Sequence, residues 1–554
     1  MEPAASYDYI IVGAGSAGCV LANRLSADPG TRVLLLEAGG HHRHFLLTMP
    51  LGFMRAMFKP QYVWPFLSEP EPHMNGRRLP IPRGRVLGGS SSINGLFYMR
   101  GHSLDFETWR QMGCSGWGYA DVLPYFRKME TSWRGAGPYH GDSGPLNVVP
   151  VQTEARLHYP LMRTAEAAGF QTSDDLHAGQ EEGFSRGELT IDAKGRRAST
   201  ARAYLAPAMA RPNLTVVTGA LSRRVVIEQR RATGVEYQDK TGVHVVRAAR
   251  EVILSGGSYN SPQLLMLSGI GPAAHLREHG IEVRHDLPGV GRNLSEHPRV
   301  PVHFTLQKPV SFLNELRFDR AAWSVLRWAL TGTGTFASQV NSCNIVIRTR
   351  DDLAQPDIQL WSNPVRMDAQ LWFPGIRKRQ QDQITADVIL LHPRSRGWVE
   401  LRSADPTDFP AITINNFADP ADLATARAGI AIARRIYRTP PQADLTGEEL
   451  LPGAALTTDA ELDDHIRRHA GVTQHPVGTC AMGTGSMSVV DPQLRVHGIE
   501  ALRVVDASVM PTVPGANINA PTIMIAERAS DLILGRVPLP PEPERVPQYE
   551  GVAA

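Results

Sequence analysis

The sequence has few cysteines, and they lie far apart. Its 554 residues include only Cys19, Cys114, Cys343 and Cys480. No two of them form a Cys-x-x-Cys pair, so neither a disulfide framework nor a zinc site is expected. Four scattered cysteines fit reduced thiols, and we therefore expect a cytoplasmic protein.

Excess charge of either sign and long apolar runs are also missing. The 57 basic and 55 acidic residues leave a formal net charge of +2, which gives no reason to expect a nucleic-acid partner. No run reaches about 18 apolar residues, so no transmembrane segment is expected. Met1–Ser6 contains no basic residue and the next apolar run is broken by glycines, which is not typical of a signal peptide. Peripheral contact with a membrane stays open.

A glycine turn lies near the N-terminus. Tyr9–Val12 favours a short strand, and Gly13-Ala14-Gly15-Ser16-Ala17-Gly18 follows it. A helix is expected over 19–27 and a second strand over 32–36, which runs into Glu37. Strand, glycine turn, helix, strand and acidic residue form the pattern of a dinucleotide-binding βαβ unit.

Each part of this pattern has a physical task. Gly13 permits the tight turn, Gly15 lets the backbone approach a pyrophosphate, and Gly18 lets the helix pack on the strand. The helix N-terminus offers unpaired N–H groups to the phosphates. Glu37, 19 residues after Gly18, is placed to accept the ribose hydroxyls. The motif predicts a dinucleotide, but it does not distinguish FAD from NAD, and a glycine turn without a ligand is the alternative.

Three further segments accompany this turn. Residues 84–101 are rich in glycine and serine, residues 257–271 read Gly-Ser-Tyr-Asn-Ser-Pro-Gln-Leu-Leu-Met-Leu-Ser-Gly-Ile-Gly, and residues 475–519 begin with His-Pro-Val-Gly-Thr. In this order, and spread over nearly the whole chain, the four features resemble the glucose–methanol–choline (GMC) oxidoreductases. The resemblance implies an FAD-dependent enzyme that removes a hydride from an alcohol carbon.

The resemblance also implies which residues bind FAD. The second glycine stretch lies along the isoalloxazine ring in the family, and some members attach FAD covalently through a histidine there. Ile93 occupies that position and cannot make the bond, so non-covalent FAD is expected. The expected cofactor-binding residues are Gly13, Gly15, Ser16, Gly18, Glu37, Ala38, Leu87, Gly88, Gly89, Ser92, Asn94, Gly95, Leu96, Val225, Asp506, Ala507, Asn519 and Thr522.

The C-terminal segment carries the expected catalytic pair. His475 matches the family's catalytic histidine, and Asn519, 44 residues further on, matches the second His or Asn of the family. An alcohol carbon releases a hydride readily only when its hydroxyl proton also leaves, which requires a base with a pKa near neutrality. We expect His475 to be that base and Asn519 to hold the substrate oxygen. Asn517, two residues away, is the weaker candidate for the second role.

The fold class is predicted to be α/β, with a discontinuous Rossmann-like FAD-binding domain and an α+β substrate domain built on an antiparallel sheet. The FAD-binding domain is expected over 1–157, 201–300 and 460–540, and the substrate-binding domain over 158–200 and 301–459. A loose tail is expected over 541–554, because this segment and the residues before it are rich in proline and charge. The strand-like run 386–391 and the helical pattern 421–438 belong to the second domain.

Other functions and motifs compete with this interpretation. Hydroxynitrile lyases share the resemblance and carry FAD without reducing it, so a non-redox lyase is the main alternative; an NAD-linked dehydrogenase and a binding module without catalysis are weaker ones. Gly183-Phe184-Ser185-Arg186-Gly187 matches G-x-S-x-G but is expected to be a polar loop rather than a hydrolase elbow. The histidines in 41–44 lack partners at metal-ligand spacing.

Predictions for the substrate side of the protein are less specific. Glu296 and His297 are expected to be structural. Core packing is favoured over a pocket lining for 360–364 and 372–374. The alcohol and the oligomeric state are not readable from the sequence, and the electron acceptor is expected to be either oxygen or a quinone or cytochrome.

Overall fold

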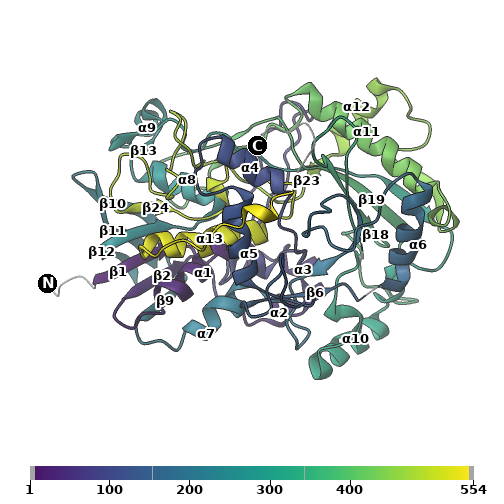
Figure 1. Cartoon of the computed structure of the whole chain (residues 1–554), viewed down its shortest axis with the longest axis horizontal. Coiled ribbons are helices and arrows are strands. Elements are labelled where there is room, and N and C mark those ends of the chain that lie inside the picture. The colour runs from purple at the N-terminus through teal and green to yellow at the C-terminus, as the bar shows by residue number, and fades with distance from the viewer. Residues whose placement is uncertain (1–5, 153, 342, 548–554) are drawn as a thin grey trace.

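Two β-sheets, each with its own hydrophobic core, organise the chain (Figure 1). The structure is a computed structural model that describes residues 6–152, 154–341 and 343–547, without the side chains of 154–156. In the view of Figure 1 the first sheet lies on the left with both the N-terminal strand and the C-terminal helix, and the second sheet lies on the right.

The first sheet has five parallel strands at its centre. Their order is β24 (Leu502–Val504), β12 (Gly242–Leu254), β1 (Ser6–Val12), β2 (Val33–Glu37) and β9 (Leu214–Thr218). The first half of β12 pairs with an antiparallel hairpin, β10 (Leu221–Glu228) and β11 (Arg231–Asp239). All five residues of β2 are buried, as expected for a parallel strand that is covered on both faces.

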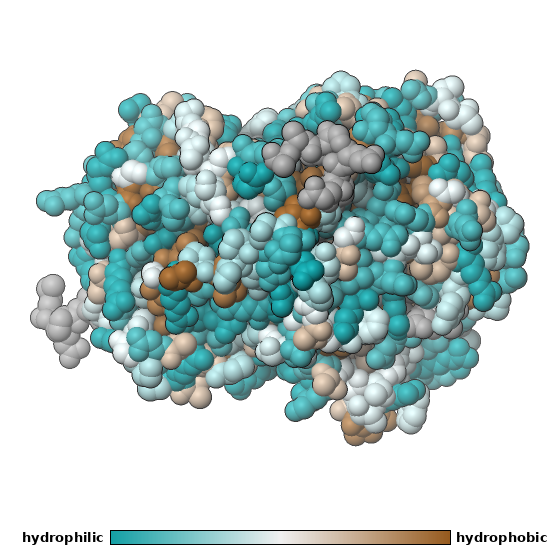
Figure 2. Space-filling view, viewed as in Figure 1, coloured by the Kyte–Doolittle hydropathy of each residue, from teal (hydrophilic) through white to brown (hydrophobic). Residues whose placement is uncertain are grey.

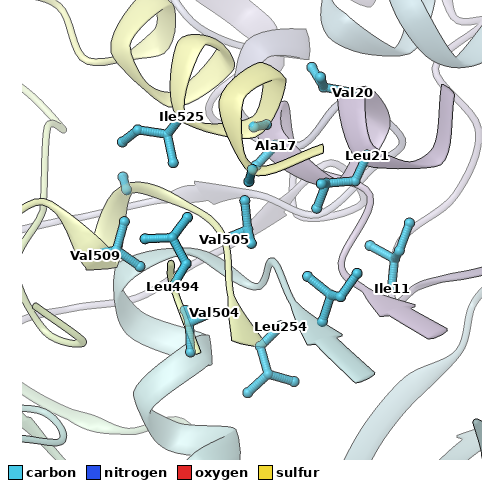
Figure 3. Packing of buried hydrophobic residues seen from close by; sticks show 14 of the residues in the cluster. Ile11, Ala17, Val20, Leu21, Leu254, Leu494, Val504, Val505, Val509 and Ile525 are labelled. Carbon is cyan, nitrogen blue, oxygen red and sulfur yellow. The ribbon is translucent and has the colours of Figure 1, made fainter. Parts of the chain in front are cut away.

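Two helices from opposite ends of the chain cover this sheet. Helix α1 (Ser16–Leu25) packs against helix α13 (Asn519–Ile533). Figure 3 shows Ala17 and Leu21 of α1 and Ile525 of α13 above Val504 and Val505, which lie at the edge of the sheet. The predicted strand, turn, helix and strand of the N-terminus are therefore confirmed, and the C-terminus completes the same core.

The second sheet is antiparallel along its main path. Its order is β22 (Thr446–Leu451), β16 (His303–Leu306), β19 (Gln383–Leu390), β18 (Ile358–Asn363), β17 (Cys343–Ile347) and β7 (Gly183–Arg186), with β15 (Pro298–Val300) and β23 (Gly471–Val472) attached through β19. Helix α11 (Pro420–Tyr437) packs on β19, where a Cβ on Gly429 would lie only 2.4 Å from Val388 Cγ1. The predicted combination of a Rossmann-like part with an antiparallel α+β part is confirmed.

The remaining longer elements surround these sheets and the space between them. They are α4 (Ser103–Gln111), α5 (Tyr119–Met129), β5 (Glu130–Ser132), β6 (Leu146–Pro150), α6 (Glu154–Ala167), α8 (Gly257–Leu267), α9 (Ala273–Glu278), α10 (Phe318–Thr331) and α12 (Asp459–His469).

The G-x-S-x-G segment is a strand and not the polar loop predicted for it. Gly183–Arg186 forms β7, which pairs with β17, and Ser185 is buried in the middle of it. The apolar ring of Phe184 and this pairing outweigh the polar residues upstream, where Glu182 instead forms an ion pair with Arg348 at 2.9 Å. A serine in the middle of a buried strand has none of the exposure of a nucleophile elbow.

The domain boundaries remain a prediction. Two short strands nevertheless show where the chain passes from one sheet to the other. β15 and β23 fall inside the ranges assigned to the FAD-binding domain, and yet both belong to the second sheet. Of the predicted loose tail, residues 541–547 are described and lie against α5, where Glu542 accepts a hydrogen bond from Arg127 at 2.6 Å. Residues 548–554 lie outside the described part of the chain.

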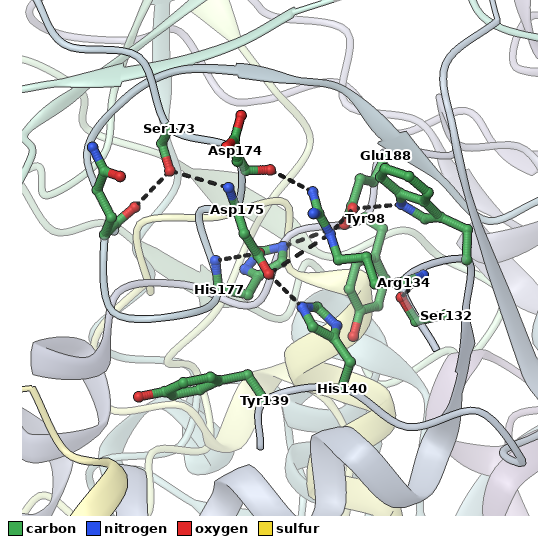
Figure 4. Close-up of polar contacts among 12 residues, drawn as sticks. Tyr98, Ser132, Arg134, Tyr139, His140, Ser173, Asp174, Asp175, His177 and Glu188 are labelled. Carbon is green, nitrogen blue, oxygen red and sulfur yellow. Dashed lines mark hydrogen bonds and ion pairs between the residues drawn. The ribbon is translucent and has the colours of Figure 1, made fainter. Parts of the chain in front are cut away.

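A buried ionic network joins β5 to three loops. Glu130 Oε1 lies 2.7 Å from Arg100 Nη2 and 2.9 Å from His140 Nδ1, and His140 Nε2 lies 2.7 Å from Asp175 Oδ2. Figure 4 shows His140 and Asp175 facing each other beside Arg134. Burial alone would raise the pKa of Glu130, but Arg100 and His140 hold it at about 2. Opposite charges therefore offset the free-energy cost of burying these groups, and we interpret the network as structural.

Candidate active site

A single cavity of about 1170 Å³ extends from the glycine turn of the first sheet to the face of the second. Gly13 and Glu37 line one end of it. His475 lines the other, together with Trp361 and Asn363 of β18. Residues 360–364 are therefore divided between core and cavity, since Leu360 and Ser362 are buried on the other side of the strand. The core packing favoured for 372–374 is wrong for Phe373 and Pro374, which are exposed in a surface loop.

In the glycine turn, Gly15 and Gly18 have the separate roles that the sequence predicts. A Cβ on Gly18 would lie 1.9 Å from the Gly13 carbonyl oxygen, so Gly18 serves the packing of helix on turn. A Cβ on Gly15 would meet only Ser255 O, at 3.7 Å, which means that protein packing does not require glycine there. The space beside Gly15 belongs to the cavity. A bulky phosphate can therefore approach the backbone at Gly15 and the N-terminus of α1.

Glu37 is buried at the edge of this turn. Its Oε2 accepts a hydrogen bond from Ala14 N at 2.9 Å, and its Oε1 accepts one from Gly39 N at 2.8 Å. Burial raises the pKa of Glu37 to about 7, although these two backbone donors lower it. A carboxyl fixed by backbone at the end of β2 lines the cavity as a ribose-binding group should.

The second glycine stretch touches the first. Gly88 has φ +90°, and a Cβ on Gly89 would lie 2.7 Å from Gly15 Cα. Two backbone segments that pass this close leave a narrow wall of glycine along the cavity. Ile93, at the position of the family's covalent histidine, is buried and lines the cavity with an apolar side chain. The residues present thus fit a flat dinucleotide cofactor held without a covalent bond.

His475 lies at the other end of the cavity and is nearly buried, with 8% of its surface exposed. Its Nδ1 lies 2.9 Å from Thr473 Oγ1 and 3.1 Å from His297 Nδ1. Burial lowers the pKa of His475 well below its usual range, and His297 and Arg83 lower it further. The imidazole is therefore neutral near pH 7 and has a lone pair for a proton, but its pKa lies below the near-neutral value expected from the sequence, because the site is buried.

The residue before His475 is held in an uncommon backbone conformation. Gln474 has φ +72°, which non-glycine residues rarely adopt. Arg83 fixes it from the second glycine region, because its Nη1 donates to Gln474 O at 2.8 Å and its Nη2 donates to Gln474 Oε1 at 2.6 Å. Arg83 thus links the orientation of His475 to the segment that lines the cofactor part of the cavity.

The asparagine beside His475 is Asn517 and not the predicted Asn519. Asn517 Nδ2 lies 3.2 Å from His475 Nε2. Asn519 begins α13, and its Oδ1 accepts a hydrogen bond from Ser16 Oγ at 2.8 Å, where the N-terminal turns of α1 and α13 meet. The physical reason is the helix start: Asn517 lies in the loop before α13 and can turn toward β23, whereas Asn519 is already in the first helical turn.

Glu296 and His297 were expected to be structural, and the structure places both against His475. Glu296 Oε1 accepts hydrogen bonds from the backbone N of His475 at 2.6 Å and of His297 at 3.0 Å. Burial raises the pKa of Glu296 to about 7 and lowers that of His297 to about 3. The sequence signal that could have revealed this was the pair of polar residues directly before the short strand β15, which pairs with the strand that leads to His475.

Most of the predicted site residues line this one cavity. Those that do are Gly13, Gly15, Ser16, Glu37, Ala38, Gly89, Asn94, Gly95, Leu96, His475, Asp506, Ala507, Asn519 and Thr522. Those that do not line it are Gly18, Leu87, Gly88, Ser92 and Val225.

Several of the residues that do not line the cavity contact the segments that do. Ser92 Oγ donates to Leu87 O at 2.8 Å, and a Cβ on Gly88 would meet Ser92 Oγ at 2.3 Å, so these three shape the glycine turn. Val225 is buried and does not line the cavity, and its backbone N–H donates to Ser268 Oγ at 2.8 Å. Its role in cofactor binding remains a prediction.

The fold and cavity are those of a dinucleotide-binding protein, and comparison with known proteins identifies the family. Family models described as GMC oxidoreductase match residues 7–299 and 393–526. The chain belongs to the GMC oxidoreductase family. It is an FAD-dependent oxidoreductase that acts on CH–OH donors.

Relatives and solved structures agree over nearly the whole chain. An oxygen-dependent choline dehydrogenase of Paraburkholderia phytofirmans is 45% identical over 96% of this chain and 95% of the relative, and one of Brucella canis is 43% identical over 96% of each. Pyridoxine 4-oxidase from Mesorbium loti is 30% identical, with a TM-score of 0.85 over 95% of this chain and 98% of that one. Formate oxidase of Aspergillus oryzae is 29% identical, with a TM-score of 0.89 over 96% and 98%.

Two further findings bear on the expectations. Within the described ranges, no group of three or more His, Cys, Asp or Glu side chains is arranged to hold a metal ion. None of the described helices combines the length and the apolar character that crossing a membrane requires.

Proposed function

We propose that this chain oxidises a primary alcohol to an aldehyde, with His475 as the base and Asn517 as the group that holds the substrate oxygen. The observation that supports this most is the pair itself: a buried, neutral imidazole whose Nε2 lies 3.2 Å from an asparagine amide, at the end of the cavity opposite Glu37. A hydroxyl placed between these groups can give its proton to one and accept a hydrogen bond from the other.

The cofactor has a natural place along the same cavity. Glu37 would hold the ribose, Gly13, Gly15 and Ser16 the pyrophosphate, and residues 89–96 the ring. When bound, FAD accepts the hydride that leaves the alcohol carbon. The protein contributes binding, orientation and the proton acceptor.

The hydrogen bonds of His475 favour Nε2 as the basic atom. The Asn517 amide nitrogen can only donate, so Nε2 carries the lone pair. The proton of the neutral ring then lies on Nδ1, toward Thr473 Oγ1. Asn517 Oδ1 is buried without a hydrogen-bond partner among the described residues. A substrate hydroxyl that enters here would meet one acceptor on His475 and both ends of the Asn517 amide.

The substrate class follows from the charges at this end of the cavity. Of the described lining residues, those from 299, 339–341, 361–367, 469–476 and 517–518, the segments that include His475 and Asn517, contain no acidic side chain, whereas the acidic lining residues Glu37, Asp408 and Asp506 come from other segments. Arg299 is the cation in the segments that include His475 and Asn517; its Nη1 donates to buried Asp387 at 2.7 Å, and its Nε is buried without a partner in the described chain. A quaternary ammonium such as choline is best held by a carboxylate or by a cage of several aromatic rings, and these segments supply one ring, Trp361. We therefore assign an uncharged or carboxylate-bearing alcohol, rather than choline, to this chain.

The experiment is anaerobic mixing of the flavin-loaded protein with a panel of alcohols, followed by the absorbance of oxidised flavin. The panel contains choline, its uncharged isostere with a tert-butyl group in place of trimethylammonium, an aryl alcohol and a hydroxyalkanoate. We expect bleaching, and faster bleaching by the isostere than by choline. The reverse order would overturn the substrate assignment alone. No bleaching by any alcohol would favour the lyase alternative and overturn the proposed function.

The electron acceptor is tested in the same cuvette. Air admitted to the bleached protein restores the flavin colour quickly if oxygen is the acceptor. A quinone or cytochrome restores it under anaerobic conditions if the enzyme is a dehydrogenase.

A further inference from the structure

Helix α10 exposes an apolar face to solvent. Trp323, Leu326 and Leu330 follow one another at helical spacing, and Trp323 is 64% and Leu330 76% exposed. Ala321, Ser324 and Trp328 on the opposite face are buried. The helix therefore has an ordinary buried face and, in addition, a second apolar face that the described chain leaves uncovered. Isolated exposed leucines are common, but a tryptophan and two leucines on one face of a helix are not.

A neighbouring loop extends this face. Phe318 N donates to Trp372 O at 2.9 Å, which fixes the start of α10 beside the loop 371–376. In this loop Ile376 is 84% exposed, and Leu371 and Phe373 are exposed as well. Figure 2 shows apolar side chains at the lower right edge of the molecule, where Figure 1 places α10. The exposed apolar residues of the two segments are Phe318, Trp323, Leu326, Leu330, Leu371, Phe373 and Ile376, and we call them the α10 surface.

Basic side chains border the α10 surface. Arg320 and Arg327 lie seven positions apart and so share one side of the helix, next to its apolar face. Arg377 and Lys378 follow Ile376 in the loop. Among the described residues none of these four cations has a carboxylate partner, whereas Asp319 of α10 and Asp368, before the loop, pair with Arg317 and Arg366. The surface thus combines apolar and cationic groups with little opposing charge.

We infer that the α10 surface docks on an anionic lipid membrane. An in-plane helix with Trp, Phe and Leu on one face and arginines at its border is the pattern of an interfacial membrane helix. The arginines reach lipid phosphates while the apolar face enters the boundary between headgroups and acyl chains. This contact differs from a transmembrane anchor, and it matches the charge of the surface better than a second copy of the same cationic surface would.

The surface lies one layer away from the active-site cavity. Trp328, on the inner face of α10, belongs to the same buried cluster as Phe53, and Phe53 lines the cavity. Exposed Phe58, a few residues on, lines the cavity too. Docking through α10 would therefore bring one rim of the cavity close to the lipid, where apolar alcohols and lipid-soluble electron acceptors concentrate.

The test uses the flavin-loaded full chain and sedimentation with vesicles of phosphatidylcholine alone or mixed with phosphatidylglycerol. We expect binding to the mixed vesicles that weakens with salt. The double substitution Trp323→Ser and Leu330→Ser should lower the partition coefficient about tenfold or more, and Arg320→Gln with Arg327→Gln about tenfold on anionic vesicles only. Flavin content and alcohol turnover without lipid should stay unchanged, which separates this inference from the proposed function.

A matched control replaces exposed apolar residues elsewhere. Val243 and Val245 lie on β12, 55% and 44% exposed, and their change to serine should leave vesicle binding as it was. Equal binding of the wild type and the Trp323→Ser, Leu330→Ser variant would overturn the inference, as would no binding to either vesicle. Dimerisation in sedimentation velocity that this variant abolishes, without vesicle binding, would assign the surface to a second copy and overturn it as well.

Discussion

At its cofactor end the cavity is walled mainly by backbone, whereas at its catalytic end it is walled by side chains from separate segments. Gly13, Gly15 and Gly89 approach within contact distance of one another or of Ser255. His475 instead meets Asn517, His297 and Thr473, which lie on different stretches of chain. The sequence encodes the backbone wall locally, through glycines that lack a side chain. The catalytic cluster instead depends on which distant loops meet in the fold. The two ends should therefore respond differently to mutation.

The largest effect is expected at His475. His475→Ala removes the base but no group at the cofactor end, so the variant should retain FAD while flavin reduction by an alcohol slows by roughly 10²–10⁴-fold. Stopped-flow absorbance under anaerobic conditions measures the rate, and the flavin-to-protein absorbance ratio measures retention. A rate within a factor of a few of the wild type would remove His475 from the mechanism.

A smaller but still large effect is expected at Asn517. Asn517→Ala deletes the amide beside His475 Nε2 and should slow flavin reduction by roughly 10²-fold, the usual cost of losing one aligned donor. Asn519→Ala is the matched control, since Asn519 bonds Ser16 at the junction of α1 and α13. It should weaken FAD retention and change the rate of reduction in the flavin-loaded fraction only a little.

The opposite result would restore the interpretation first drawn from the sequence. If Asn519→Ala slowed reduction and Asn517→Ala did not, Asn519 would be the group that holds the substrate oxygen, and the loop before α13 would have to rearrange when FAD and alcohol bind.

The contrast between the two ends also explains what the sequence could predict. The turn at Gly13–Gly18 is local: its residues, its strand and its helix are neighbours in the chain, and the structure confirms their arrangement. Asn517 could not be distinguished from Asn519, because the choice depends on where α13 begins, and helix starts are poorly fixed by local pattern. Glu296 and His297 were missed because their contact with His475 comes from the pairing of β15 with β23 across the fold.

Prediction also failed where local polarity was taken as a guide to exposure. The polar run before Gly183 suggested a loop, but pairing with β17 makes Gly183–Arg186 a strand. A strand far away in sequence therefore decided the structure of this segment.

At the cofactor end two glycines of one turn should fail in different ways. Gly15→Ala adds a methyl group that the protein tolerates but that projects into the cavity, so the fold should persist while FAD binds about tenfold or more weakly. Gly18→Ala places a Cβ against the Gly13 carbonyl oxygen and should cost about 3 kcal/mol of folding stability. Thermal unfolding and FAD titration of the apoprotein separate the two effects. Equal loss of stability in both variants would show that packing, not the cofactor, requires Gly15.

The smallest effects concern pH, and they arise where the catalytic end is most deeply buried. Because burial depresses the pKa of His475, the base stays neutral through the range in which an exposed histidine titrates, about 6.5. The kcat/KM for an alcohol should therefore fall only at pH values below that range. Glu296, whose pKa burial raises to about 7, should add a second and shallower inflection near neutrality, because its negative charge above that pH favours the protonated form of His475.

Glu296→Gln tests this coupling with a side chain of the same shape. The amide oxygen can still accept from the backbone N of His475, so the site should fold and turn over, and the inflection near pH 7 should vanish while the acid limb remains. An acid limb centred at or above about 6.5 in both proteins would mean that His475 titrates as an exposed imidazole does. In that case water would reach His475 in the working enzyme more readily than its contacts with Asn517 and His297 imply.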